Sequence, residues 1–162
     1  NRTVYSRSPL FNAQKEGEEP RRLHLGIDIW AKPYTPVAAP LPGIVHSFAF
    51  NNDYGDYGAT IVLSHQLDGV SFYTLYGHLS LNSIKNLQEG ERMDAGDIIG
   101  DIGIPVENGH WPSHLHFQII KDIQGWRGNF PGVCKYSEKD IHLQNCPNPD
   151  IILQLQDYVR PN

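Results

Sequence analysis

Hydrophobic positions along this chain fall in short β-branched or aromatic runs, and Gly, Pro and polar residues separate one run from the next. The 15 Gly and 12 Pro are scattered along the chain rather than clustered, as is typical of an all-β domain. The pattern predicts six strands, near 25–29, 44–50, 60–64, 71–76, 98–101 and 115–120.

The links between these runs indicate antiparallel pairing. Residues 66–69, with Asp68 and Gly69, join two runs through a connection typical of a hairpin. Residues 51–58 form a longer polar loop that is rich in turn formers. Short links of this kind connect strands that run in opposite directions.

The C-terminal part of the chain predicts a surface excursion followed by a short helix. Periodicity is lost over 125–146. Asn148 as a cap and Pro149 at the first helical position then introduce an amphipathic helix that we expect to pack on the sheet. Its apolar positions are Ile151, Ile152, Leu155 and Val159. We therefore predict one domain over 1–162, with a core at about 22–122 and a surface extension with the helix over 123–162.

Charge and hydropathy exclude two classes of partner. The chain of 162 residues has 13 Lys+Arg against 18 Asp+Glu, a net charge of −5, and no basic cluster. Nucleic-acid binding is therefore not expected. No apolar stretch approaches the roughly 18 residues of a membrane span, so we expect no transmembrane segment. Because the chain begins at Asn1 rather than Met, we expect a processed product or a piece of a longer protein.

The two cysteines leave two possibilities open. Cys134 and Cys146 could form a disulfide or remain buried free thiols. Their spacing is not CxxC and no histidine pair is near, so they are a poor zinc knuckle.

The histidines are the candidates for catalysis or metal binding. Four of them fall in three short segments with apolar neighbours: His24, His78, and the pair His114 and His116. Residues two apart on a strand point to the same face, about 6.6 Å from each other. His114 and His116 can therefore face one point while Leu115 and Phe117 face the core. This arrangement suits a metal ligand beside an acid/base group. Two histidines on a solvated sheet face are the alternative.

His24 and Asp28 can share an ion only if the backbone bends between them. In a straight strand they would be about 13 Å apart, whereas bonds to zinc are roughly 2 Å long. Gly26 can adopt dihedral angles that are closed to other residues, so we expect the bend there.

The available side chains favour a catalytic metal rather than a structural one. Two imidazoles and one carboxylate, with a fourth position left to water, are the arrangement of a catalytic zinc. The helical HExxH motif is absent. Asp28 is the only carboxylate near the histidine motifs with an obvious ligand role.

An ordered series of motifs runs from about His24 to Ile120. The series comprises His24-xxx-Asp28, Pro36-Val37-Ala38-Ala39-Pro40 with Gly43-Ile44-Val45, Tyr57-Gly58, Tyr73 to Ser80, Ala95 to Gly100, and His114-Leu115-His116-Phe117. With these motifs the chain resembles the lysostaphin-type zinc endopeptidases, the LytM-domain family of metallopeptidases that cut peptide cross-links in bacterial cell walls. The resemblance implies an all-β fold, an antiparallel sheet or sandwich with long loops and a short C-terminal helix.

The resemblance also implies the residues of the site. One zinc ion per chain would be bound by His24, Asp28 and His116, with His78 and His114 as the two unliganded catalytic histidines. Zinc lowers the pKa of a bound water towards about 7, and an imidazole can take the water proton and pass it to the leaving amine. We expect His114 to be the base, because its strand neighbour His116 holds the metal. His78 would orient the water or stabilise the oxyanion as a donor, and an exchange of the two roles is the alternative.

The function implied is that of a zinc-dependent endopeptidase acting on peptidoglycan stems or cross-bridges, in the periplasm or outside the cell. One alternative is a non-catalytic LytM-like binding or regulatory domain. The segment 130–150 also resembles endopeptidase-like domains embedded in long chains that carry an aminotransferase. A second alternative is therefore a zinc amidohydrolase-like module of a larger cytoplasmic enzyme.

The chain departs from the family pattern at two places. Before His114 the family has small residues, whereas residues 104–113 here are bulky and include Trp111. Ahead of His24 the family has a tyrosine and a glycine-rich segment, which Arg21 and Arg22 with two glutamates replace here. Substrate access and the oxyanion partner are therefore expected to differ.

Aromatic residues in the predicted loops are candidates for a ligand groove. They are Tyr54, Tyr57, Trp111 and Trp126, of which we expect at most two to line it. Trp30, directly after the Asp28 segment, is expected in the core.

Overall fold

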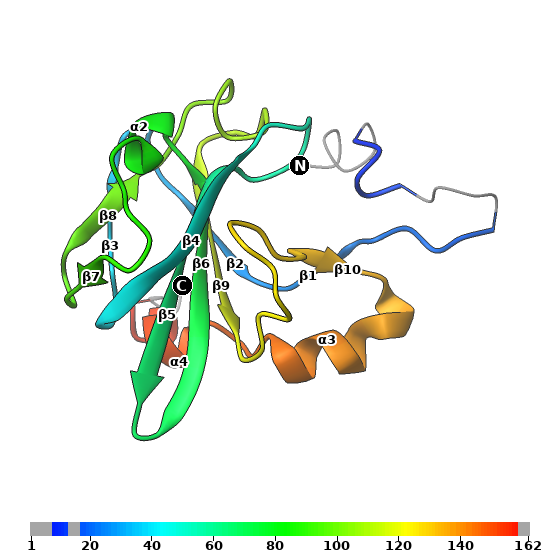
Figure 1. Ribbon diagram of the computed structural model, residues 1–162. Coiled ribbons are helices and arrows are strands. Elements are labelled where there is room, and N and C mark those ends of the chain that lie inside the picture. The colour runs from blue at the N-terminus through cyan, green and yellow to red at the C-terminus, as the bar shows by residue number, and fades with distance from the viewer. Residues whose placement is uncertain (1–7, 13–16, 159–162) are drawn as a thin grey trace.

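A six-stranded antiparallel sheet forms the centre of the computed structural model, which describes residues 8–12 and 17–158 (Figure 1). Its strand order is β2-β9-β6-β5-β4-β7. The strands are β2 (Ile27–Trp30), β9 (His114–Ile120), β6 (Val70–Leu79), β5 (Gly58–Leu67), β4 (Gly43–Asn51) and β7 (Arg92–Met93). The predicted all-β antiparallel class is confirmed.

Two small sheets flank the central one on opposite sides (Figure 1). One pairs β3 (Pro36–Ala38) with β8 (Ile98–Asp101), and the other pairs β1 (Leu23–His24) with β10 (Val133–Cys134). The helical elements are short. They are α2 (Leu81–Ile84), α3 (Lys139–Asn145), α4 (Asp150–Leu153) and two 3-10 turns, η1 (Tyr136–Glu138) and η2 (Leu155–Asp157). Among the residues described, none of these helices combines the length and the apolar character that crossing a bilayer requires.

The predicted hairpin is confirmed: it joins the end of β5 to the start of β6. Asp68 and Gly69 make the turn with φ angles of 49° and 80°, the left-handed values that a two-residue hairpin needs. The predicted strand near 25–29 is instead two strands, because the chain leaves β1 at His24 and enters β2 at Ile27.

Both faces of the central sheet are covered, and the two faces differ in chemistry. On one face, Leu115, Phe117 and Ile119 of β9 join the larger hydrophobic cluster. On the other, the alternating residues are His114, His116 and Gln118, which are all buried although polar. A polar row buried in this way is costly unless each group has a partner, so the row marks a site.

The segment 125–146, predicted as a surface excursion, is exposed or half-buried over most of its length, but a few of its residues are buried in the core. Phe130, Cys134 and Cys146 are buried in the second hydrophobic cluster, which also contains Leu25 and Ile120. Both cysteines are free thiols. The segment has no periodicity because β10 is two residues long and its burial depends on contacts with β1 and β9, which are distant in sequence. The division of the chain into a core and an extension stays a prediction.

A short C-terminal helix is confirmed, but it is one turn long. Gln154 adopts a left-handed conformation (φ 50°) that ends α4 before the predicted helix is complete. The side chain of Asn148 accepts a hydrogen bond from the Asp150 N–H (3.0 Å), as expected of a capping residue. Ile152 packs against the larger cluster, as predicted. Val159 lies outside the described residues.

Candidate metal centre and cavity

Strand β9 carries two of the predicted site residues in its buried polar row. His114 and His116 are both 2 % exposed and point to the same face of the sheet. Their neighbours Leu115 and Phe117 point into the core, so the predicted alternation is confirmed. The alternative of a solvated histidine face is excluded by this burial.

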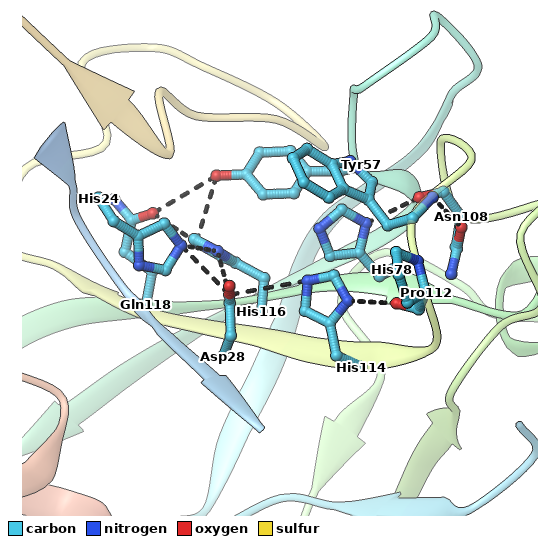
Figure 2. Close-up of polar contacts among 10 residues, drawn as sticks. His24, Asp28, Tyr57, His78, Asn108, Pro112, His114, His116 and Gln118 are labelled. Atoms are coloured by element: carbon cyan, nitrogen blue, oxygen red, sulfur yellow. Dashed lines mark hydrogen bonds and ion pairs between the residues drawn. The ribbon is translucent and has the colours of Figure 1, made fainter. Parts of the chain in front are cut away.

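Strand pairing and a change of sheet bring His24 and Asp28 to the same point. Asp28 on β2 lies directly opposite His116 on β9, so the register sets this pair. His24 ends β1 in the neighbouring small sheet, and the chain then turns into β2. Figure 2 shows the three side chains converging from these strands. The predicted bend between His24 and Asp28 therefore exists.

Gly26 is needed at this bend for space rather than for its dihedral angles. It is not among the residues with a positive φ, so that part of the prediction is wrong. A Cβ at this position would lie 2.6 Å from the carbonyl oxygen of Phe117 and 2.7 Å from Nε2 of His116. Any larger side chain would displace the His116 ring.

The donor atoms of these three residues form a small triangle. Nε2 of His24 is 2.9 Å from Nδ1 of His116. Oδ1 of Asp28 is 3.2 Å from Nε2 of His24 and 3.4 Å from Nδ1 of His116. Ligands around a tetrahedral ion with bonds of 2.0–2.1 Å are about 3.3 Å apart. The triangle therefore has the size at which three ligands share one zinc ion.

Asp28 provides an independent test of this fit. Its Oδ1 is buried, and among the described residues it has no hydrogen-bond partner. Burial by itself would raise the pKa of this carboxyl, but the imidazoles of His116 and His24 outweigh burial and hold the pKa well below its ordinary value. A buried carboxylate oxygen without a hydrogen bond is costly unless it binds a cation, so the residues present fit a metal.

A chain of hydrogen bonds sets the tautomer of His116. The carbonyl of Pro131 can only accept, so the amide nitrogen of Gln118 faces it (3.2 Å), and also faces Sγ of Cys146 (3.3 Å). Oε1 of Gln118 then accepts the Nε2–H of His116 (2.9 Å). Nδ1 of His116 is left with its lone pair toward Asp28, which is the form that a metal requires.

His114 and His78 lie beside the triangle with their rings 4.3 Å apart. Nδ1 of His114 donates to the carbonyl of Pro112 (2.6 Å), and Nδ1 of His78 donates to that of Asn108 (2.8 Å). In the neutral rings each Nε2 therefore carries a lone pair. Nε2 of His114 lies 3.7 Å from Oδ1 of Asp28.

Burial keeps these imidazoles neutral. It lowers the pKa of His114 and of His116. It lowers the pKa of His78 well below the ordinary value, and the neighbouring His114 and His116 rings add to this effect. Neutral imidazoles beside an ionised carboxylate are the protonation state in which ligands bind a divalent cation.

His78 reaches the site through an irregular backbone. Regular alternation along β6 would place it on the same face as Tyr76, which packs on Phe117 in the larger cluster. Instead, the φ of His78 is 64°, a left-handed value that is uncommon for a residue with a side chain. Its ring thereby joins His114 on the polar face.

All five predicted residues line one cavity of 210 Å³. Three of the four candidate aromatics also line it, one more than expected: Tyr57, Trp111 and Trp126. Tyr54 instead stacks on His110.

Trp30, which was expected in the core, is 57 % exposed and stacks on His114 with 4.7 Å between ring centroids. Trp30 lies opposite His114 at the end of edge strand β2, so its ring covers the histidine rather than the core.

Two contributors were missed in the sequence. Gln118 lies two residues after His116 on the same strand face, and this spacing could have identified it. The cavity wall formed by Leu10 and Phe11 carries no local signal, because its position depends on a contact with Trp111, whose ring centroid is 6.1 Å from that of Phe11.

The sequence pattern of Peptidase family M23 matches residues 22–128. An L-Ala–D-Glu endopeptidase of Bacillus subtilis is 32% identical over 127 residues, which cover 75% of this chain and 36% of that protein. A DD-carboxypeptidase/endopeptidase, Mpg, of Neisseria meningitidis serogroup B is 35% identical over 97 residues, 60% of this chain and 20% of that protein. The chain thus spans about a third or less of the length of these curated relatives.

Solved structures with a similar fold include the catalytic domain of lysostaphin from Staphylococcus simulans. The TM-score is 0.52 at 25% sequence identity, and the alignment covers 83% of this chain and 87% of that one. The catalytic domain of an M23 protein, EnpA, from Enterococcus faecalis gives a TM-score of 0.53 at 22% identity, over 75% of this chain and 92% of that one.

Proposed function

The chain belongs to peptidase family M23, and on that premise we propose that it is a zinc-dependent endopeptidase that hydrolyses peptide bonds in peptidoglycan stems or cross-bridges. We further propose that it acts outside the cytoplasm, in the periplasm or beyond, where such a substrate lies. The single observation that carries the proposal is the convergence of two imidazoles and one carboxylate beside two spare imidazoles in one cavity.

Nε2 of His24, Oδ1 of Asp28 and Nδ1 of His116 would hold one zinc ion per chain. Three protein ligands leave a coordination position open, as in catalytic rather than structural zinc sites. Zinc bound there would polarise the scissile carbonyl and lower the pKa of a water to about 7. Zinc is favoured over Mg²⁺ or Ca²⁺ because those ions prefer all-oxygen ligands.

His114 is the proposed general base. Its Nδ1–H is held by the carbonyl of Pro112, so Nε2 presents its lone pair toward the ligand triangle, 3.7 Å from Asp28. Nε2 can accept the proton of the attacking water and then donate it to the leaving amine. The stack with Trp30 holds the ring in place.

His78 would orient the water. Its Nδ1–H is likewise held by a carbonyl, so the neutral ring offers an acceptor at Nε2 and no second donor. A water can donate one hydrogen bond to His78 and its other proton to His114. This hydrogen bonding favours the orienting role over the oxyanion-donor role, because His78 would have to be protonated before it could donate from Nε2.

The direct test combines metal content with turnover. Purified protein should contain about one zinc per chain and should cleave a muropeptide, with the new amine and carboxylate identified by mass spectrometry. Chelator should stop cleavage, and added zinc should restore it. Zinc-loaded, folded protein that is inert toward a panel of stem peptides and cross-bridges would contradict the proposal. If zinc then raised only the melting temperature, a non-catalytic binding domain would be favoured.

Gln118→Met should weaken zinc binding about 10- to 100-fold, because Met has a similar volume but cannot accept the Nε2–H of His116. Zinc affinity can be measured by competition with a chromophoric chelator. Gln66→Met, at an exposed position on β5, is the matched control and should leave the affinity unchanged. Equal affinities of the two variants would show that Gln118 does not position His116.

A further inference from the structure

One wall of the cavity carries a guanidinium that the proposed mechanism does not use. Arg21 lies just before β1 and lines the same cavity as the ligand triangle, together with Asp56 from the loop between β4 and β5. Its side chain is partly buried. The cavity therefore joins a catalytic end with five site residues to a wall that presents a cation.

Within the described part of the chain, the guanidinium of Arg21 is not neutralised by a direct ion pair. Its backbone N–H donates to the carbonyl of Phe11 (3.0 Å), and Nη2 donates to the carbonyl of Leu10. Among residues 8–12 and 17–158, it forms no salt bridge. A guanidinium has five N–H donors, and most of those of Arg21 have no partner among the described residues.

Asp56 is an acidic residue that lines the same cavity as Arg21, and its carboxylate is engaged with the backbone. Its Oδ1 accepts the backbone N–H of Tyr57 (2.7 Å). Burial raises the pKa of this carboxyl, while the charge of Arg21 acts to lower it. The charge of Arg21 therefore affects the pKa of Asp56 although the two side chains form no ion pair.

The surroundings of Arg21 strengthen binding of an anion. Leu10, Phe11, Trp111 and Val133 line the adjoining wall, and the last three form one hydrophobic cluster. Apolar walls lower the local dielectric and make a charge-assisted hydrogen bond stronger than in water. A planar fork of donors matches a carboxylate in two parallel hydrogen bonds.

We propose that Arg21 binds a free carboxylate of the substrate, and that the chain therefore prefers peptides with a carboxylate near the scissile bond over the same peptides with an amide there. This inference rests on the proposed function, because it names the substrate class of that site. The carboxylate can be the α-carboxylate of a C-terminus or that of an acidic side chain, since both present the same two oxygens.

Three peptides of one sequence separate these sources. The first has a free C-terminus and an internal Glu, the second has a C-terminal amide and the same Glu, and the third has a free C-terminus with Gln replacing Glu. For the zinc-loaded protein, kcat/KM should fall about 10- to 100-fold when the carboxylate that Arg21 binds is replaced. The peptide that shows this fall identifies which carboxylate is bound.

Variants of Arg21 then connect the preference to this residue. Arg21→Gln should lower kcat/KM about 10- to 100-fold for the preferred peptide and leave that for its amide counterpart unchanged. Arg21→Lys should retain part of the preference, because the charge is kept and the fork is lost. Arg22→Gln is the matched control: Arg22 is exposed and does not line the cavity, so the same change of charge should have no effect.

The two peptides are compared on the same variant. A loss of folded protein would therefore lower kcat/KM for the carboxylate peptide and for its amide counterpart equally, and the ratio of the two values would not change. Equal kcat/KM of the wild type for all three peptides, or an equal loss of all three in Arg21→Gln, would overturn the inference. Binding is followed separately by tryptophan fluorescence, since Trp111 and Trp126 line the cavity. If no peptide is cleaved but carboxylate peptides bind in an Arg21-dependent way, the proposed function fails and the inference stands.

Discussion

Replacing His116 with alanine is expected to abolish zinc binding, and hydrolysis is expected to fall to the rate of chelator-treated protein. Nδ1 of His116 is one of the three donor atoms of the triangle, 2.9 Å from Nε2 of His24 and 3.4 Å from Oδ1 of Asp28. Two remaining ligands are too few for a tetrahedral site that must also keep a position for water. Metal content by atomic absorption and turnover of a muropeptide are the two measurements.

The melting temperature with and without zinc is a third measurement on His116→Ala. A ligand that binds only the folded state at about 1,000 times its Kd stabilises that state by roughly 4 kcal/mol. The wild type should therefore melt at a higher temperature with zinc, whereas His116→Ala should show no such shift. His142→Ala is the control, because His142 lies on α3, does not line the cavity, and has its Nε2 3.8 Å from Oε2 of Glu138. Wild-type zinc stoichiometry in His116→Ala would refute the assigned ligand set.

His114→Ala should keep its zinc and lose about 10²- to 10⁴-fold in kcat, the range expected when a general base is removed. Zinc content and kcat should respond differently to this substitution, because His114 lies beside the ligand triangle without being part of it. Zinc content and kcat should be measured on the same preparation.

Two outcomes would change the assignment. Loss of zinc in His114→Ala would make His114 a ligand rather than a base. A kcat within a few fold of the wild type, together with a large loss in His78→Ala, would mean that the two histidines have exchanged roles.

Residues of β9 were predictable from the sequence because strand alternation is a local property. His114-Leu115-His116-Phe117 places two imidazoles on one face and two apolar residues on the other whatever the rest of the fold is. The series of motifs that resembles the lysostaphin-type peptidases added the other members of the site. All five predicted residues line one cavity in the structure.

The sequence predicts that the backbone bends between His24 and Asp28, but it does not show what causes the bend. We expected Gly26 to turn the chain through unusual dihedral angles. In the structure the turn results from leaving one sheet and entering another, and Gly26 provides space for the His116 ring. Steric room between segments distant in sequence cannot be deduced from either segment alone.

His78 shows where alternation fails. Counting from Tyr76 would place it on the core face, and only a left-handed backbone at His78 turns it to the site. No Gly or Asn marks that position in the sequence. The conformation is maintained by neighbouring segments, since the His78 N–H donates to Tyr57 and its carbonyl accepts from Gly103.

The sequence by itself determined the all-β class and the alternating histidines of β9, which follow from residue type and short spacings, and its series of motifs implied the other site residues through a family resemblance. Only the tertiary structure decided that Gln118 sets the tautomer of His116, that Trp30 covers His114, and that Arg21 enters the same cavity. These arrangements depend on which strands pair and on how segments outside the central sheet pack against it, and such contacts between distant segments leave no periodic signal in the chain.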